Sequence, residues 1–221
     1  MLRSFAVAFF ALALTTPGGR SFGAGFSLFI DPRFGSTEHT GSTAQVEFDF
    51  GEQGGEDRLT LTITNTTPLA IQSHLTAVGF EIPRTVLDPS VIDLLVSPGY
   101  FDVLTYDQTI SPPWIDAPDG YDLVLTGDGS ILGGDPQGAP RAGETTTVIL
   151  TLGDTGLSPE DLADSFQQFY LQADDRFLIG RFQVVGRVDD SDKVGGGVPE
   201  PAALLLLMIG GAAVVANRRR S

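Results

Sequence analysis

The sequence contains no cysteine and only two histidines, His39 and His74. The absence of cysteine excludes disulfide bridges, thiolate nucleophiles and cysteine-ligated metal sites. Neither histidine stands in a metal-binding or nucleophile motif, so general acid–base catalysis by histidine has few candidate residues. We expect a protein that is not an enzyme and that uses no cofactor and no metal.

Positive charge is also scarce in the central part of the chain. Residues 24–200 hold all 28 acidic residues but only eight of the 13 basic ones. Nucleic acids are bound mainly through Lys and Arg contacts with phosphates, so this charge balance excludes nucleic acid as a partner. With 42% hydrophobic and 19% charged residues the chain is typical of a packed protein, and 221 residues fit one domain with terminal signals.

Residues 1–24 have the pattern of a secretion signal peptide. Arg3 precedes an apolar run from Phe5 to Leu14, which a Pro17-Gly18-Gly19 break follows. This run is too short to span a bilayer, whereas the apolar core of a signal peptide needs only about 7–15 residues. We expect recognition by the general secretion machinery and cleavage near Gly23 or Ala24.

The C-terminal residues 198–221 combine three features in a fixed order. A short motif comes first, an uncharged and mainly apolar run over residues 202–216 follows, and a basic cluster ends the segment; the motif is Val198, Pro199, Glu200 and Pro201, and the cluster is Arg218, Arg219 and Arg220. The apolar run predicts a short transmembrane helix. Flanking arginines stay in the cytoplasm, so we expect an anchor in the inner membrane with the preceding chain outside.

This order of Pro-Glu-Pro, apolar helix and arginines resembles the PEP-CTERM sorting signal. The resemblance covers about a tenth of the chain. It implies processing by exosortase, a membrane-embedded cysteine-dependent enzyme, near Pro199–Pro201, followed by release or transfer to the cell surface. It also implies a Gram-negative bacterium that makes extracellular polysaccharide, and a role in the biofilm matrix.

The segment 188–197 is polar and rich in glycine, which is the composition of a flexible tether. We expect it to be a linker between the sorting signal and a folded domain over residues 25–187.

The domain itself is predicted to be all-β. Residues 44–50 and 59–64 alternate apolar with polar side chains, as half-buried strands do. Further strands are predicted at 26–30, 75–82, 101–105, 121–126, 147–152 and 177–185, and residues 89–96 fit either a helix or a strand. Eight short strands separated by turns predict an antiparallel β-sandwich or jelly roll. A short helix is predicted near 158–169, because Ser158 can cap it and Pro159 suits its first position.

One surface cluster is a candidate for carbohydrate contact. Acidic residues stand among two aromatic ones, so a sugar could stack on the rings while carboxylates bind its hydroxyl groups; the cluster is Trp114, Asp116, Asp119, Tyr121 and Asp122. The same residues fit a rigid surface turn rich in proline and glycine. We therefore expect a structural or interaction role associated with exopolysaccharide. The alternative is a carbohydrate-binding module, with or without calcium, and a glycoside-active enzyme ranks last.

Overall fold

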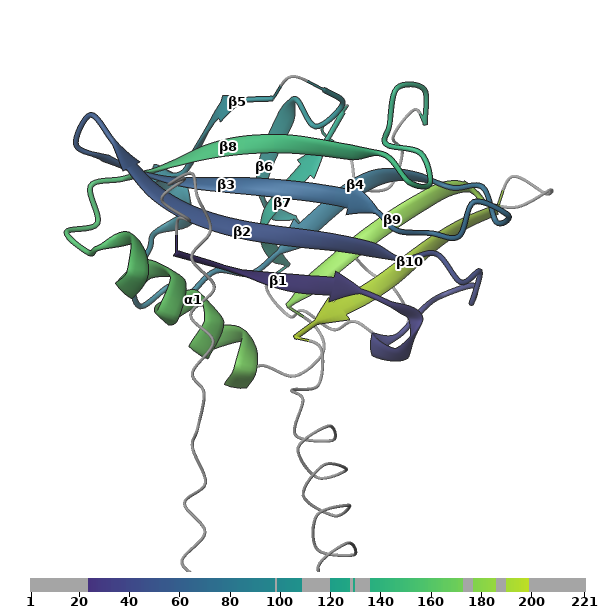
Figure 1. Cartoon of the computed structure of the whole chain (residues 1–221), viewed down its shortest axis with the longest axis horizontal. Helices are drawn as coiled ribbons and strands as arrows, with labels where there is room; N and C mark the ends of the chain where they lie inside the picture. Colours follow the sequence, from purple (N-terminus) through teal and green to yellow (C-terminus); the bar gives the residue numbers. More distant parts are fainter. Residues whose placement is uncertain are drawn as a thin grey trace, which may run out of the picture.

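The computed structural model describes residues 24–97, 99–108, 120–127, 129, 136–172, 177–185 and 190–198. Within these residues the chain forms ten strands, one α-helix and two short 3-10 helices (Figure 1). The elements, in order, are β1 (Ala24–Ile30), η1 (Pro32–Phe34), β2 (Ala44–Gln53), β3 (Glu56–Asn65), β4 (His74–Phe80), η2 (Pro89–Val91), β5 (Asp93–Val96), β6 (Val103–Gln108), β7 (Tyr121–Thr126), β8 (Thr145–Gly153), α1 (Pro159–Gln172), β9 (Leu178–Val185) and β10 (Asp190–Gly197).

All ten strands belong to one sheet, with the order β5-β8-β3-β2-β1-β10-β9-β4-β7-β6 and antiparallel pairing throughout. The longest ladder joins β2 to β3 through a turn at Gly54 and Gly55, whose φ angles of 71° and 84° favour glycine. Inward side chains of β2, including Val46, Phe48 and Phe50, are buried, and the polar ones between them face outward. The period-two pattern therefore sets which face of this hairpin meets the core.

The sheet curls so that its two halves face each other across one apolar core. Phe48 of β2 meets Phe80 of β4 edge to face, with ring centroids 5.7 Å apart. The end strands also come close, since the Tyr106 hydroxyl of β6 donates to the carbonyl oxygen of Ile92, just before β5, at 2.6 Å. The predicted antiparallel all-β class is confirmed. The arrangement is a single sheet that is nearly closed, in place of the two separate sheets of a sandwich, because the short β1–β10 ladder joins the halves.

Helix α1 packs its apolar face against β1 and β2 (Figure 1). The helix begins as predicted, because the Ser158 hydroxyl accepts from the Asp161 N–H at 3.1 Å and donates to its carboxylate at 2.8 Å. It continues to Gln172, beyond the predicted end, and buries Phe166 and Tyr170. In the described part of the chain, no helix has the length and apolar character needed to cross a membrane. The predicted transmembrane helix over 202–216 and residues 1–23 of the predicted signal peptide lie outside the described residues.

The predicted linker over 188–197 is wrong for residues 190–197, which form β10 between β1 and β9. The glycines that suggest a tether are there because the packing is close. A Cβ atom on Gly196 would lie 2.6 Å from Cδ2 of Leu178 and 2.8 Å from the carbonyl oxygen of Phe29. The folded domain therefore extends ten residues beyond the predicted end at 187, to Gly197.

The eight predicted strands are all present, with bounds shifted by a few residues. Residues 89–96 hold both alternatives in turn, the 3-10 helix η2 and then the edge strand β5.

Candidate functional site

The C-terminal end of β10 is where the folded domain meets the predicted sorting motif. Gly195 exchanges backbone hydrogen bonds with the loop around η1, accepting from Asp31 and donating to Gly35, both at 3.0 Å. Gly197 pairs with Phe29 of β1, and Val198 packs against the core as a partly buried residue. The motif therefore begins where the sheet ends, with no spacer between them.

The start of β10 is fixed by the carboxylate of Asp192, which is fully buried. It accepts hydrogen bonds from six donor groups, all in the loop between η1 and β2. Three are hydroxyl groups: that of Ser36, whose oxygen lies 2.9 and 2.8 Å from the two carboxylate oxygens, that of Thr37 at 3.1 Å and that of Thr40 at 2.7 Å. The other three are the backbone N–H groups of Thr37, Glu38 and Thr40 at 3.0–3.1 Å. This carboxylate replaces the water that the loop backbone would otherwise need.

Hydrogen bonding and burial act in opposite directions on the pKa of Asp192. Burial raises the pKa of its carboxyl group, but hydrogen bonds to Thr40, Glu38 and Ser36 outweigh burial and hold the pKa below its usual range. Asp192 is therefore ionised at neutral pH, and its six donor groups satisfy the charge.

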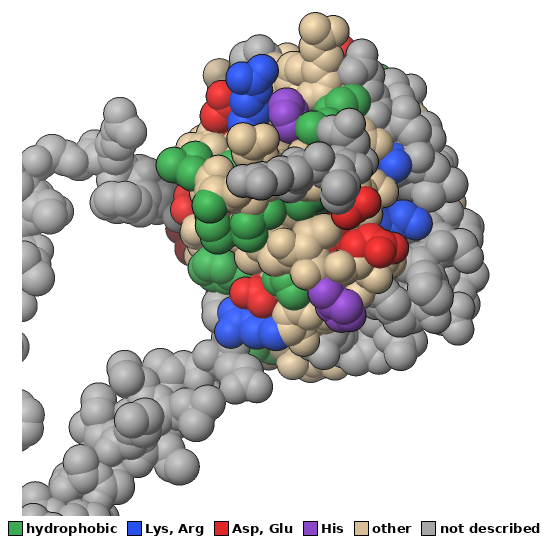
Figure 2. Space-filling view, turned by 90° about the vertical axis from the view of Figure 1, so that its right-hand side faces the viewer, with side chains coloured by type: hydrophobic (Ala, Val, Ile, Leu, Met, Phe, Trp, Pro, Cys, Tyr) green, Lys and Arg blue, Asp and Glu red, His purple; other side chains and the backbone are tan. Residues whose placement is uncertain are grey.

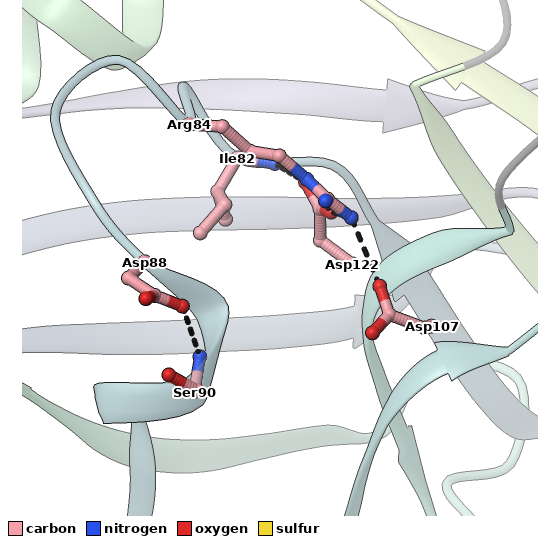
Figure 3. A network of polar contacts seen from close by, with 6 residues as sticks. All are labelled: Ile82, Arg84, Asp88, Ser90, Asp107 and Asp122. Carbon is pink, nitrogen blue, oxygen red and sulfur yellow. Dashed lines mark hydrogen bonds and ion pairs between the residues drawn. The ribbon is translucent and has the colours of Figure 1, made fainter.

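A second polar network lies at the junction of β4 and β7 (Figure 3). The buried Asp122 carboxylate accepts from the Ile82 N–H at 2.8 Å and from Nε of Arg84 at 2.6 Å. The Arg84 guanidinium also pairs with Asp107 of β6 at 2.9 Å, and these contacts, first the hydrogen bond to Asp122, raise its pKa. Arg84 thus bridges a buried and an exposed carboxylate.

Glu81 stands beside this network, and its pKa is strongly raised. Burial, followed by a hydrogen bond with the Asp122 side chain, raises the pKa of Glu81 to about 8. The buried Tyr170 hydroxyl donates to the Glu81 backbone carbonyl at 2.7 Å, and its own pKa is raised by burial. The ion pair of Arg84 with Asp122 gives this network a structural role.

The prediction of a carbohydrate contact is wrong for the two residues of the cluster that the structure describes. Tyr121 and Asp122 have no exposed surface, so neither reaches a ligand on the outside of the molecule. All six residues of β7 are buried, and this strand lies between β4 and β6, whereas the acidic side chain in this strand had suggested a solvent-facing position. The partner Arg84 lies 38 positions away, and no local pattern points to it. Trp114, Asp116 and Asp119 lie outside the described residues.

A pocket of about 360 Å³ lies at the end of the molecule where β4 begins, lined by Leu69, Gln72, Ser73, His74, Arg141 and Ala142. Figure 2 faces this end and shows histidine, basic and apolar side chains close together near its upper edge. His74 and Arg141 are joined by an isolated bridge, and Nδ1 of His74 bonds to the Pro136 carbonyl oxygen at 2.9 Å. Backbone contacts therefore hold the imidazole and the base of the arginine at the pocket, which could take an anionic group.

Comparison with protein families identifies the C-terminal segment. Residues 197–220 match the PEP-CTERM protein-sorting motif. The chain carries a PEP-CTERM sorting signal. This signal implies an exported protein that exosortase processes and that is directed to the cell envelope or outside it. The chain matches none of the curated proteins and none of the solved structures with which it was compared.

Within the sorting signal, the structure describes Gly197 and Val198. The other motif residues, Pro199, Glu200 and Pro201, and the cluster of Arg218, Arg219 and Arg220 lie outside the described residues. The PEP-CTERM match overlaps the last residue of β10, so the signal and the sheet share Gly197.

Proposed function

We propose that this protein is a non-enzymatic component of the cell surface or extracellular matrix, whose β domain exosortase delivers. The observation that carries the proposal is the PEP-CTERM match over residues 197–220. The folded domain supplies the cargo, an acidic all-β body with a large shared core. Its acidity keeps it soluble outside the cell.

The steps before and after processing complete the proposal. The basic start and apolar run of residues 1–24 suit entry through the general secretion machinery. The apolar run over 202–216 and the arginines Arg218–Arg220 suit a transient anchor in the inner membrane, with the domain outside. Association with exopolysaccharide would then keep the released domain at the cell surface.

The mass and location of the protein in its native host test this proposal. We expect the wild-type protein to lose the segment after the motif and to leave the inner membrane. Replacement of Pro199, Glu200 and Pro201 by alanine should keep the full mass and retain the protein in the membrane. A wild-type protein that remains intact in the membrane would contradict the proposal and leave a simple anchored domain.

A second candidate function, carbohydrate binding, rests on the His74–Arg141 pocket. An acidic polysaccharide offers carboxylates that a guanidinium binds in a bidentate manner, and an apolar side chain, Leu69, lies beside them. Binding of the processed protein to carboxylated oligosaccharides, compared with neutral ones, tests this function. Arg141→Ala should abolish the preference for carboxylated ligands, whereas Arg33→Ala, at a surface site on η1, should leave it unchanged.

If no oligosaccharide binds, the scaffold function is the remaining candidate. Equal binding of carboxylated and neutral oligosaccharides would exclude the Arg141 pocket as the source of recognition. Hydrolysis of a glycoside by the purified protein, lost on replacement of a carboxylate, would replace both candidates with an enzyme.

A further inference from the structure

Strand β10 has two halves that are held in different ways. Its first half contains Asp192, which six donor groups contact, and Val194, which is fully buried in the core. Its second half is Gly195–Gly197, which has no side chains to bury. Burial of apolar side chains is the main source of packing energy, so the second half is held chiefly by its backbone.

The backbone contacts of the second half are few. Gly195 bonds to Asp31 and Gly35, and the ladder with β1 consists of two pairs, Ile30 with Gly196 and Phe29 with Gly197. On the other side, β9 pairs with Gly195 and Gly196 through Ile179 and Leu178. Such an end can open locally while the rest of the sheet stays folded.

The opening matters because the motif match begins at Gly197. A peptidase that cuts within residues 199–201 needs several residues before the cut in extended form, free of other hydrogen-bonding partners. In the folded domain these residues are the end of β10 and Val198, which packs against the core. The closed sheet therefore withholds part of the substrate segment from the enzyme.

We propose that residues 195–198 detach from β1 and β9 and are bound in extended form by the processing peptidase, while Asp192 holds the rest of β10 in place. This inference rests on the proposed function. The glycines suit both the closed and the open state. They allow close packing against Leu178 and Phe29 when the sheet is closed, and when the segment detaches they expose no apolar side chains of their own. Only the open state is cut. When opening and closing are fast relative to cleavage, the rate of processing is therefore proportional to the population of the open state.

A disulfide lock tests the inference, and the chain offers a background free of cysteine. Phe29 and Gly197 face each other in register, and opposed residues of antiparallel strands lie close enough for a disulfide. A Cβ at Gly197 would lie 3.2 Å from the Phe34 ring, which a small shift accommodates. We expect the oxidised Phe29→Cys/Gly197→Cys variant to be processed at least tenfold more slowly than wild type, and reductant to restore processing.

The matched control is Ser27→Cys/Glu47→Cys, which links β1 to β2 at another opposed pair and leaves β10 free. It should be processed at the wild-type rate in both redox states. Insertion of six Gly and Ser residues after Val198 in the locked variant should restore processing under oxidising conditions, because the spacer supplies the extended segment. A locked variant processed at the wild-type rate while its disulfide is intact would overturn the inference.

Two further outcomes separate this inference from the proposed function. If the wild-type protein itself is never processed, the proposed function fails. If the wild type is processed but the reduced Phe29→Cys/Gly197→Cys variant is not, hydrogen exchange of the native protein tests the inference instead. The amides of Gly195–Gly197 should exchange at least tenfold faster than those of Asp192–Val194. Equal protection of the two groups would overturn the inference.

Discussion

The Ser36 hydroxyl lies 2.9 and 2.8 Å from the two carboxylate oxygens of Asp192, which ties β10 to the loop that precedes β2, 156 positions away in the sequence. This contact places the last strand of the domain in the middle of the sheet, next to one of its first strands. The two ends of the described chain are thereby held together at Asp192, a few residues before the sorting signal begins.

Asp192→Asn should destabilise the domain more than any surface change on the same strand. One of the two carboxylate oxygens becomes an NH₂ group that faces donors, and the negative charge that six donor groups surround is lost. We expect a loss of about 2–4 kcal/mol in the free energy of unfolding, measured by urea denaturation. Asp190→Asn, at an exposed position of β10, is the control and should change stability by less than about 0.5 kcal/mol.

The same carboxylate predicts an acid-sensitive domain. The pKa of Asp192 is lowered in the folded state, so its contribution to stability is present above the pKa of the unfolded chain and is lost as the pH falls through the folded value. The stability difference between wild type and Asp192→Asn should therefore shrink in strongly acidic solution. A constant difference down to pH 2 would show that the charge of Asp192 is not what stabilises the loop.

Gly196→Ala tests whether close packing or chain flexibility explains the glycines of β10. The added methyl group would overlap Leu178 and the Phe29 carbonyl oxygen, and we expect a loss of about 1–3 kcal/mol. Gly51→Ala is the control in β2, because no atom lies within 4 Å of the position of its Cβ. That change should be neutral or slightly stabilising, as removal of a glycine reduces the entropy of the unfolded chain. Equal melting temperatures for the two variants would contradict the packing account.

Sequence patterns within one segment predicted the helices and strands whose signals lie inside that segment. They failed where contacts with a distant strand determine the structure. The alternation of Val46, Phe48 and Phe50 identifies β2, and Ser158 identifies the start of α1, because each signal lies within one element. The glycines of β10 look the same in a tether and in a strand. Only Leu178 and Phe29, from distant positions, distinguish the two, since they leave no space for a side chain.

The candidate site likewise has one part that the sequence predicts and one part that it does not. The order of Pro-Glu-Pro, apolar run and arginines can be read along the chain, and the family comparison confirms it. The roles of Asp122 and Arg84 depend on a contact across 38 positions, so an acidic residue in an apolar strand looked like part of an exposed surface. Burial of Asp122 is a tertiary property, which neighbouring residues do not encode.

Glu81→Gln should change how stability depends on pH. The folded pKa of Glu81 is raised to about 8, whereas in the unfolded chain the residue titrates near 4.5. Between these values the folded state binds the extra proton, so stability falls as the pH rises through this window. The neutral amide removes this loss, and after allowance for solvent screening we expect a gain of about 1–2 kcal/mol at pH 8.5 and little change at pH 4. Thermal melting across this range, with Glu56→Gln at an exposed site as the control, measures the effect.

Arg84→Ala should show that the Asp122 carboxylate depends on a single guanidinium. Arg84 is half exposed, whereas the side chain of Asp122 is 1% exposed, so loss of the arginine leaves a buried carboxylate with the Ile82 N–H and the Glu81 side chain as partners but without its cation. We expect a loss of about 3 kcal/mol in the free energy of unfolding. Asp107→Ala removes the exposed partner of the same arginine and should cost less than about 1 kcal/mol, because surface ion pairs contribute little. Equal losses for the two variants would mean that Arg84 acts through Asp107 and that the buried pair with Asp122 contributes little to the stability of the fold.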